Sequence, residues 1–129
     1  MEKRIKILLV EDEVIAAMYL QYQLKSVGYN ELCHVTTGKE AIISAREKQP
    51  DVILMDIRLA DDIDGIEAAT KIKLESDIPI IFLTGYDDDI VRERAEKLKP
   101  LEYLIKPYEV KTIKKIIDAH FGLSSNVVF

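Results

Sequence analysis

The chain has 129 residues, 48% of them apolar and 32% charged, which fits a single soluble domain with its own core. The net charge of −5 disfavours nonspecific binding to nucleic acid, because that binding comes mainly from neutralisation of phosphates by Lys and Arg. No apolar run approaches the ~20 residues that span a bilayer, and the single cysteine, Cys33, cannot form an internal disulfide, so we expect a cytoplasmic protein with no membrane segment.

The first half of the chain alternates aliphatic runs with amphipathic segments. In chain order we predict a strand over Arg4–Val10, a helix over Val14–Gly28, a strand over Tyr29–Val35, a helix between Thr37 and Pro50, and a strand over Asp51–Ile57. Thr37 followed by Glu40 has the spacing of a helix N-cap. In the first helix, the apolar positions at helical spacing are Ala16, Leu20, Leu24 and Val27.

The second half continues the same alternation. The predicted elements are a helix over Ile66–Ser76, a strand over Ile78–Tyr86, a helix over Asp87–Pro100 with Val91, Ala95 and Leu98 inward, a short strand over Leu101–Ile105, and a last helix that Gly122 closes, with Val110, Ile113 and Ile117 inward. Five strands alternating with five helices predict an α/β fold. We expect a parallel sheet covered on both faces and joined by right-handed crossovers.

Polar side chains gather where the predicted strands end. Ligands of open parallel sheets bind at the carboxyl ends of the strands. This sequence places there Glu11, Asp12 and Glu13 after the first strand, Asp56 at the end of the third, Thr84 at the end of the fourth, and Lys106 after the fifth. Carboxylates without His or Cys favour a hard cation such as Mg²⁺. A carboxylate beside such an ion, a hydroxyl and an ammonium group can accept a phosphoryl group.

The motifs that carry these residues match one family jointly. The segments VED, LMDI, DG, IIFLTGY and YLIKP, in this order, resemble the receiver domain of two-component response regulators from about Lys3 to Gly122. The resemblance implies a flavodoxin-like (βα)5, doubly wound, five-stranded parallel sheet with strand order 2-1-3-4-5. We therefore assign residues 1–122 to a receiver domain and residues 123–129 to a short tail or truncated linker.

The resemblance also assigns roles to the residues at the strand ends. Asp56 would be the phosphoacceptor, and Lys106 would pair with the phosphoryl oxygens. Thr84 and Tyr103 would be the switch residues, which move inward on activation. The peptide bond between Lys106 and Pro107 would be cis.

The implied metal site uses oxygen ligands. Mg²⁺, with Mn²⁺ as an alternative ion, would be held by Asp12 directly, by Glu11 through water, by Asp56, and by the main-chain carbonyl of Arg58. Glu13 is expected to serve the helix N-terminus instead. The side chains of Arg58 and Tyr86 would shield the phosphoryl group from attacking water.

The implied function is a phosphorylation-dependent switch. A sensor histidine kinase or phosphotransfer protein would phosphorylate Asp56, and the surface from about Asp87 to Ala119 would then control an output partner or pair with a second copy. We expect a regulator that catalyses only its own phosphorylation and slow dephosphorylation, with no direct binding to nucleic acid. The alternatives are an unphosphorylated docking module and a flavodoxin-like enzyme or nucleotide-binding protein. A Gly-rich phosphate loop after the first strand would favour the last, and the sequence has none there.

Other polar residues are given structural roles. We expect the acids of the loop after Asp56 to be solvated: these are Asp61, Asp62 and Asp64. His34 is placed on a strand away from the site. His120, on the last helix, and the tyrosines around the first helix, Tyr19, Tyr22 and Tyr29, are read as packing or surface residues, and Cys33 as a small side chain within a strand.

Overall fold

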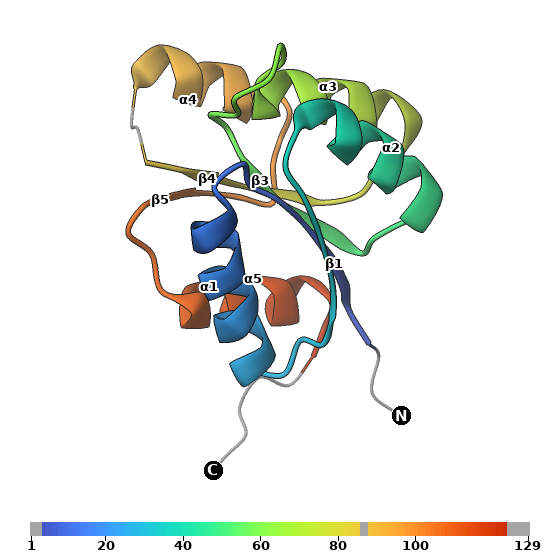
Figure 1. The fold of residues 1–129 in the computed structure, drawn as a ribbon, viewed down its shortest axis with the longest axis vertical. Helices are drawn as coiled ribbons and strands as arrows, with labels where there is room; N and C mark the ends of the chain where they lie inside the picture. Colours follow the sequence, from blue (N-terminus) through green and yellow to red (C-terminus); the bar gives the residue numbers. More distant parts are fainter. Residues whose placement is uncertain (1–3, 86–87, 124–129) are drawn as a thin grey trace.

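The computed structural model describes residues 4–85 and 88–123, which form a parallel sheet with helices on both faces (Figure 1). The elements in chain order are β1 (Lys6–Val10), α1 (Val14–Ser26), β2 (Glu31–Val35), α2 (Gly38–Lys48), β3 (Val52–Asp56), α3 (Gly65–Glu75), β4 (Ile80–Thr84), α4 (Asp89–Glu96), β5 (Glu102–Ile105) and α5 (Val110–His120). Among the described residues, no helix combines the length and apolar character needed to cross a membrane.

The strand order is β2-β1-β3-β4-β5, and every neighbouring pair is parallel. This confirms the flavodoxin-like topology that the sequence predicts. The chain runs outward from β1 to β2, then crosses over to β3 and continues to β5. All five strands therefore end at the same edge of the sheet, where their terminal side chains can meet.

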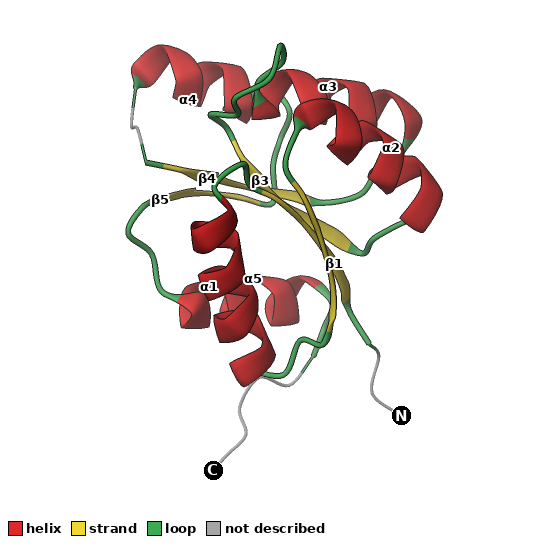
Figure 2. Cartoon of the chain, viewed as in Figure 1, coloured by secondary structure: helices red, strands yellow, loops and turns green. Residues whose placement is uncertain are grey.

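Two apolar layers hold the helices to the sheet. Helices α2, α3 and α4 pack on one face, and α1 and α5 on the other (Figure 2). The central strands β3 and β4 are buried at every position, which explains why they read as continuous aliphatic runs. Side chains alternate between the two layers along each strand: Ile53 and Met55 face α2 and α3, while Val52 and Leu54 face α1 and α5.

Several predicted boundaries and burial positions need correction. In α1 the prediction is wrong for one position, because Ala17 is fully buried and Ala16 only half-buried, while Leu20 and Leu24 are buried as predicted. Helix α4 ends at Glu96, before Lys99 adopts a positive φ of 51° and Pro100 follows. Lys3, the predicted strand end at Tyr86, the helix start at Asp87, and all of the predicted tail except Leu123 lie outside the described residues.

The helix starts follow their capping residues. The Thr37 side chain accepts a bond from the Glu40 main-chain N–H, as the sequence predicts for α2. Helix α3 begins with a full capping box, in which Asp64 accepts from the N–H of Glu67 and the Glu67 side chain accepts from the N–H of Asp64. These caps fix where the loops at the carboxyl edge of the sheet turn into helices.

Candidate functional site

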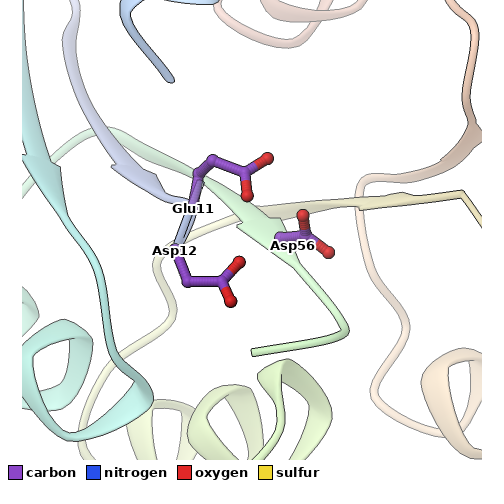
Figure 3. Close-up of side chains that lie close together, drawn as sticks. All are labelled: Glu11, Asp12 and Asp56. Atoms are coloured by element: carbon purple, nitrogen blue, oxygen red, sulfur yellow. The ribbon is translucent and has the colours of Figure 1, made fainter. Parts of the chain in front are cut away.

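Three carboxylates meet at the carboxyl edge of the sheet (Figure 3). Glu11 and Asp12 directly follow β1, and Asp56 ends the neighbouring strand β3. One ligand atom from each lies within 4.8 Å of the others. Glu11 and Asp56 are only 6% and 5% exposed, so their charges are poorly screened by water and need a cation nearby.

Lys106, which follows β5, supplies one such cation. Its ammonium nitrogen lies 2.9 Å from Asp56 Oδ2 and 3.3 Å from Glu11 Oε1. Burial alone would lower the pKa of Lys106, but the hydrogen bond and charge of Asp56, with those of Glu11, outweigh burial and raise that pKa. Lys106 therefore stays charged and joins β1, β3 and β5 at the site.

The three acids differ in what else holds them. The second carboxylate oxygen of Glu11 accepts from the main-chain N–H of Glu13 at 3.0 Å, and that of Asp56 accepts from the N–H of Arg58 at 3.1 Å. Within residues 4–85 and 88–123, no donor is recorded for the carboxylate of Asp12. Asp12 thus has both oxygens available for a ligand.

Thr84 and Tyr103, the two predicted switch residues, lie on the neighbouring strands β4 and β5. Thr84 ends β4 and is 1% exposed, and its main-chain oxygen accepts from the N–H of Lys106 at 2.7 Å. Tyr103 is buried in the layer beneath α3 and α4, and the Arg92 guanidinium lies 4.7 Å from its ring centroid. The Lys106–Pro107 peptide bond is cis. Contact between Arg92 and Tyr103 links β5 to α4, a contact that the sequence did not indicate.

The loop after Asp56 is anchored at both ends. A Cβ on Gly65 would overlap the main-chain oxygen of Asp56 and lie 2.9 Å from Ile57 Cα, so only glycine lets α3 begin this close to β3. Asp64 pairs with Arg94 of α4 at 3.1 Å, and Asp61 accepts from the N–H of Gly38 at 3.5 Å.

The expectation of a fully solvated acidic loop is therefore wrong for two of its three acids. Asp61 faces the first residue of α2, and Asp64 caps α3 while pairing with α4. Asp62, which is 86% exposed at its side chain and reaches Lys39 only at 3.5 Å, fits that expectation. The sequence of the loop does not indicate these contacts, because they join segments that are 23 to 30 residues apart.

Two further side chains reach this region without having been predicted there. His34 Nε2 lies 2.8 Å from the main-chain oxygen of Glu11, so the placement of His34 away from the site is wrong. Tyr108 is packed beside Lys106, and burial first, with the charges of Glu11 and Asp56, raises its pKa to about 12. The register of β2 on β1 could have revealed His34, since His34 pairs with Leu9, two residues before Glu11. Tyr86, a predicted shielding residue, lies outside the described part of the chain.

The donor set fits a divalent hard cation. The cluster offers carboxylate oxygens, with no thiolate or imidazole nitrogen among its ligand atoms. Mg²⁺ prefers such oxygen ligands and keeps several waters when it meets phosphate groups. A bound cation would also offset the mutual repulsion of the acids, which Lys106 compensates only for Glu11 and Asp56.

Comparison with known proteins gives a consistent result. Residues 7–118 match the family described as the response regulator receiver domain. The transcriptional regulatory protein PdtaR of Mycobacterium tuberculosis is 31% identical over 113 residues, which are 88% of this chain and 55% of that protein. The phyllosphere-induced regulator PhyR of Methylorubrum extorquens is 31% identical over 114 residues, 88% of this chain and 42% of its own length. The chain thus spans about half the length of these curated relatives.

Solved structures agree with the sequence relatives. The signal receiver domain of a modulated diguanylate cyclase from Desulfovibrio desulfuricans is 36% identical with a TM-score of 0.84, covering 91% of this chain and 93% of that one. The receiver domain of a sensor histidine kinase from Pseudomonas aeruginosa is 32% identical with a TM-score of 0.82, covering 93% and 99% of the two chains, and its structure holds a magnesium ion in the active-site cleft.

Proposed function

Because this chain belongs to the response regulator receiver domain family, we propose that it is a signalling switch that accepts a phosphoryl group on Asp56. The observation that carries this proposal is the setting of the Asp56 carboxylate. It ends a fully buried strand, accepts a 2.9 Å bond from Lys106, and shares a cluster with Glu11 and Asp12. The family is one of signalling modules, so the chain acts as a regulator and not as an enzyme that turns over a metabolite.

The proposed step is a phosphoryl transfer to a carboxylate. One oxygen of Asp56 attacks the phosphorus of a phosphorylated donor, the new P–O bond replaces the bond to the donor, and the donor leaves with that electron pair. Lys106 already lies beside Asp56 and would pair with the incoming phosphoryl oxygens. The N–H of Arg58, 3.1 Å from Asp56 Oδ1, orients the nucleophile.

The acids beside Asp56 would hold the divalent cation. Asp12 would bind it directly, Glu11 would bind it through water, and Asp56 and the Arg58 carbonyl would complete the protein ligands. When bound, Mg²⁺ or Mn²⁺ would neutralise charge on the transferring phosphoryl group. This ligand set and the choice of Mg²⁺ are part of the proposal.

The phosphoryl group would act on the surface formed by α4, β5 and α5 through Thr84 and Tyr103. It adds about two negative charges at pH 7, next to Thr84 and Lys106. A move of Thr84 toward the phosphoryl group would leave space beside Tyr103, whose ring contacts Arg92 of α4. Any shift of Tyr103 would therefore change the surface formed by α4, β5 and α5, through which we propose that the chain meets an output partner or a second copy.

The donor would be a sensor histidine kinase or a phosphotransfer protein. Helix α1 starts two residues after Asp12 and exposes five large apolar side chains, each between 54% and 79% exposed: Val14, Ile15, Met18, Tyr19 and Tyr22. An exposed apolar stripe of this kind is typical of a protein-binding surface. We propose that the donor packs on this stripe, since from there its phosphorylated group would be close to Asp56.

Arg58 is proposed to prolong the phosphorylated state. Its side chain is exposed and lies two residues beyond Asp56, so it can cover the phosphoryl group against water. Loss of the phosphoryl group from the parent and from Arg58→Ala can be compared directly, and equal rates would show that Arg58 gives no protection.

The central experiment is phosphorylation by a small donor. The metal-free chain is incubated with acetyl phosphate, with and without Mg²⁺, and its intact mass is measured. We expect the gain of one phosphoryl group with Mg²⁺, no gain without it, no gain in Asp56→Asn, and a normal gain in the control Asp62→Asn. A parent chain that gains no mass would overturn the proposal and favour an unphosphorylated docking module.

A further inference from the structure

The main chain between Glu11 and Asp12 is held by a side chain from the edge strand β2. His34 Nε2 lies 2.8 Å from the main-chain oxygen of Glu11. A carbonyl oxygen only accepts, so the imidazole must carry its proton on Nε2 to make this bond. The histidine thus has a defined tautomer, and its ring is fixed next to the proposed metal site.

The bond from His34 to the Glu11 carbonyl takes the place of a main-chain hydrogen bond that a longer β2 strand would donate. The pairing of β1 with β2 ends at Val10 and Val35, and the N–H of Glu11 still donates to the Val35 oxygen at 3.1 Å. Beyond Val35 the chain turns away to start α2 at Gly38, so no β2 main-chain donor continues alongside Glu11. The His34 side chain takes that place and satisfies the Glu11 carbonyl, which would otherwise be left at the edge of a buried strand.

The effect of His34 extends to Asp12. The carbonyl of Glu11 belongs to the planar peptide unit that also contains the nitrogen and Cα of Asp12. Holding that oxygen therefore fixes the nitrogen and Cα of Asp12, the atoms from which the Asp12 side chain projects. Glu11 and Asp56 have protein donors on both carboxylate oxygens, whereas Asp12 has none among the described residues, so its carboxylate depends on the main chain for its position.

We propose that His34 is a positioning residue for the divalent cation: through the Glu11 carbonyl it aims the Asp12 carboxylate into the acidic cluster. This inference rests on the proposed function, because it assumes that the cluster binds a cation. His34 is not one of the clustered ligands, which among the described residues are the carboxylates of Glu11, Asp12 and Asp56. Outer hydrogen bonds of this kind commonly tune metal affinity by orienting the ligands.

The test compares Mg²⁺ binding in matched variants. The dissociation constant for Mg²⁺ is measured by calorimetry on the metal-free parent, His34→Ala, His34→Gln and His120→Ala. We expect His34→Ala to bind Mg²⁺ about three- to tenfold more weakly, as the loss of one hydrogen bond implies. His34→Gln, whose amide can donate, should recover most of the affinity, and His120→Ala, at the far end of α5, should match the parent.

A second readout separates positioning from a general structural role. At saturating Mg²⁺, phosphorylation of His34→Ala by acetyl phosphate should return to the parent's rate, because only the affinity has changed. If His34→Ala fails to fold, long-range nitrogen–proton spectra of the metal-free parent at pH 8 still decide, since the proposal requires a proton on Nε2, and an Nδ1–H tautomer overturns it.

The two proposals fail in different ways. Equal Mg²⁺ affinity in the parent and His34→Ala overturns the role of His34 and leaves the proposed function intact. A parent that binds no Mg²⁺ and gains no phosphoryl group overturns the proposed function, and the role of His34 with it.

Discussion

At the scale of single residues, the site depends on close approach as much as on charge. Gly65 has no side chain because the main chain of β3 occupies the place of its Cβ. Its N–H donates to the Ile57 oxygen at 2.8 Å, which fixes the start of α3 against the end of the strand that carries Asp56. The Asp-Gly pair of the sequence therefore has a packing reason: Asp64 caps the helix, and Gly65 lets it approach.

Gly65→Ala should be destabilising for this reason. The added methyl group must push α3 away from Asp56 or shift β3, and overpacking of this kind costs about 1–3 kcal/mol. Urea unfolding of the variant and of Gly85→Ala provides the comparison, since a Cβ on Gly85 would meet only Lys106 Cδ at 3.8 Å. An unchanged free energy of unfolding in Gly65→Ala would contradict the close approach.

Tyr29 is a buried tyrosine whose hydroxyl group bonds to a buried carboxylate. Its hydroxyl donates to Asp118 Oδ1 at 2.7 Å, and Asp118 also pairs with Lys114 at 2.8 Å. Burial first, then the hydrogen bond and charge of Asp118, raise the pKa of Tyr29 well above its usual value. The buried phenol thus stays protonated in the folded chain at pH values where an exposed one ionises.

This shift predicts a loss of stability at alkaline pH. Above about pH 10 the unfolded chain releases the Tyr29 proton while the folded chain keeps it, so the free energy of unfolding should fall as pH rises. In Tyr29→Phe the decline should be shallower, by up to about 1.4 kcal/mol per pH unit. Urea unfolding from pH 9 to 11 measures it, with exposed Tyr22→Phe as the control. Equal slopes in the parent and Tyr29→Phe would be the contrary result.

At the scale of elements, α1 carries apolar side chains on both its buried and its exposed side. Its inner side buries Ala17, Leu20 and Leu24 against the sheet and α5. Its outer side carries no charged residue from Val14 to Leu24, although 32% of the chain is charged. Periodicity alone would have predicted polar residues there, so the apolar outer side is better explained by binding than by the fold.

A charge placed on this outer side should separate protein donors from small ones. Tyr19→Glu should reduce phosphorylation by a sensor histidine kinase that phosphorylates the parent chain, because it introduces a charge into an apolar contact. Phosphorylation by acetyl phosphate should not change. Leu74→Glu, at an 82% exposed position on α3, is the control. Equal kinase-driven rates in Tyr19→Glu and the parent would rule out α1 as the docking surface.

At the scale of the whole molecule, the acidic cluster brings like charges close together, which costs stability when no cation is bound. The fold holds three carboxylates within 4.8 Å of one another, and Lys106 forms ion pairs with two of them, Glu11 and Asp56. Like charges at such separations repel by about 1–4 kcal/mol, depending on the local dielectric. The metal-free fold therefore carries strain that a bound cation would relieve.

Asp12→Asn tests whether repulsion among the three carboxylates lowers the stability of the metal-free chain. We expect the metal-free variant to be more stable than the parent by about 1–3 kcal/mol, because one repelling charge is gone. Mg²⁺ at ten times its dissociation constant should stabilise the parent by about 1.4 kcal/mol and the variant much less. Thermal melts with EDTA and with Mg²⁺ measure both effects, and Asp62→Asn controls for charge alone. A metal-free variant no more stable than the parent would show that the cluster is not strained.

Local sequence patterns predicted the strands, their alternation with helices, and the residues at the strand ends. These follow from local patterns: aliphatic runs, helical spacing, and capping residues such as Thr37. The family resemblance supplied the strand order, which the structure confirms. Helix and strand ends such as those of α4 shifted by a few residues, because local signals there are weak.

The partners of the polar side chains, by contrast, depend on how distant segments pack together. Lys106 reaches Glu11 across 95 residues, Arg94 reaches Asp64 across 30, and His34 reaches the Glu11 carbonyl across 23. A sequence pattern records burial and periodicity within a segment, whereas these contacts depend on the register and packing of separate elements. For this reason the sequence pattern predicted His34 away from the site, whereas the folded structure places it against the Glu11 carbonyl.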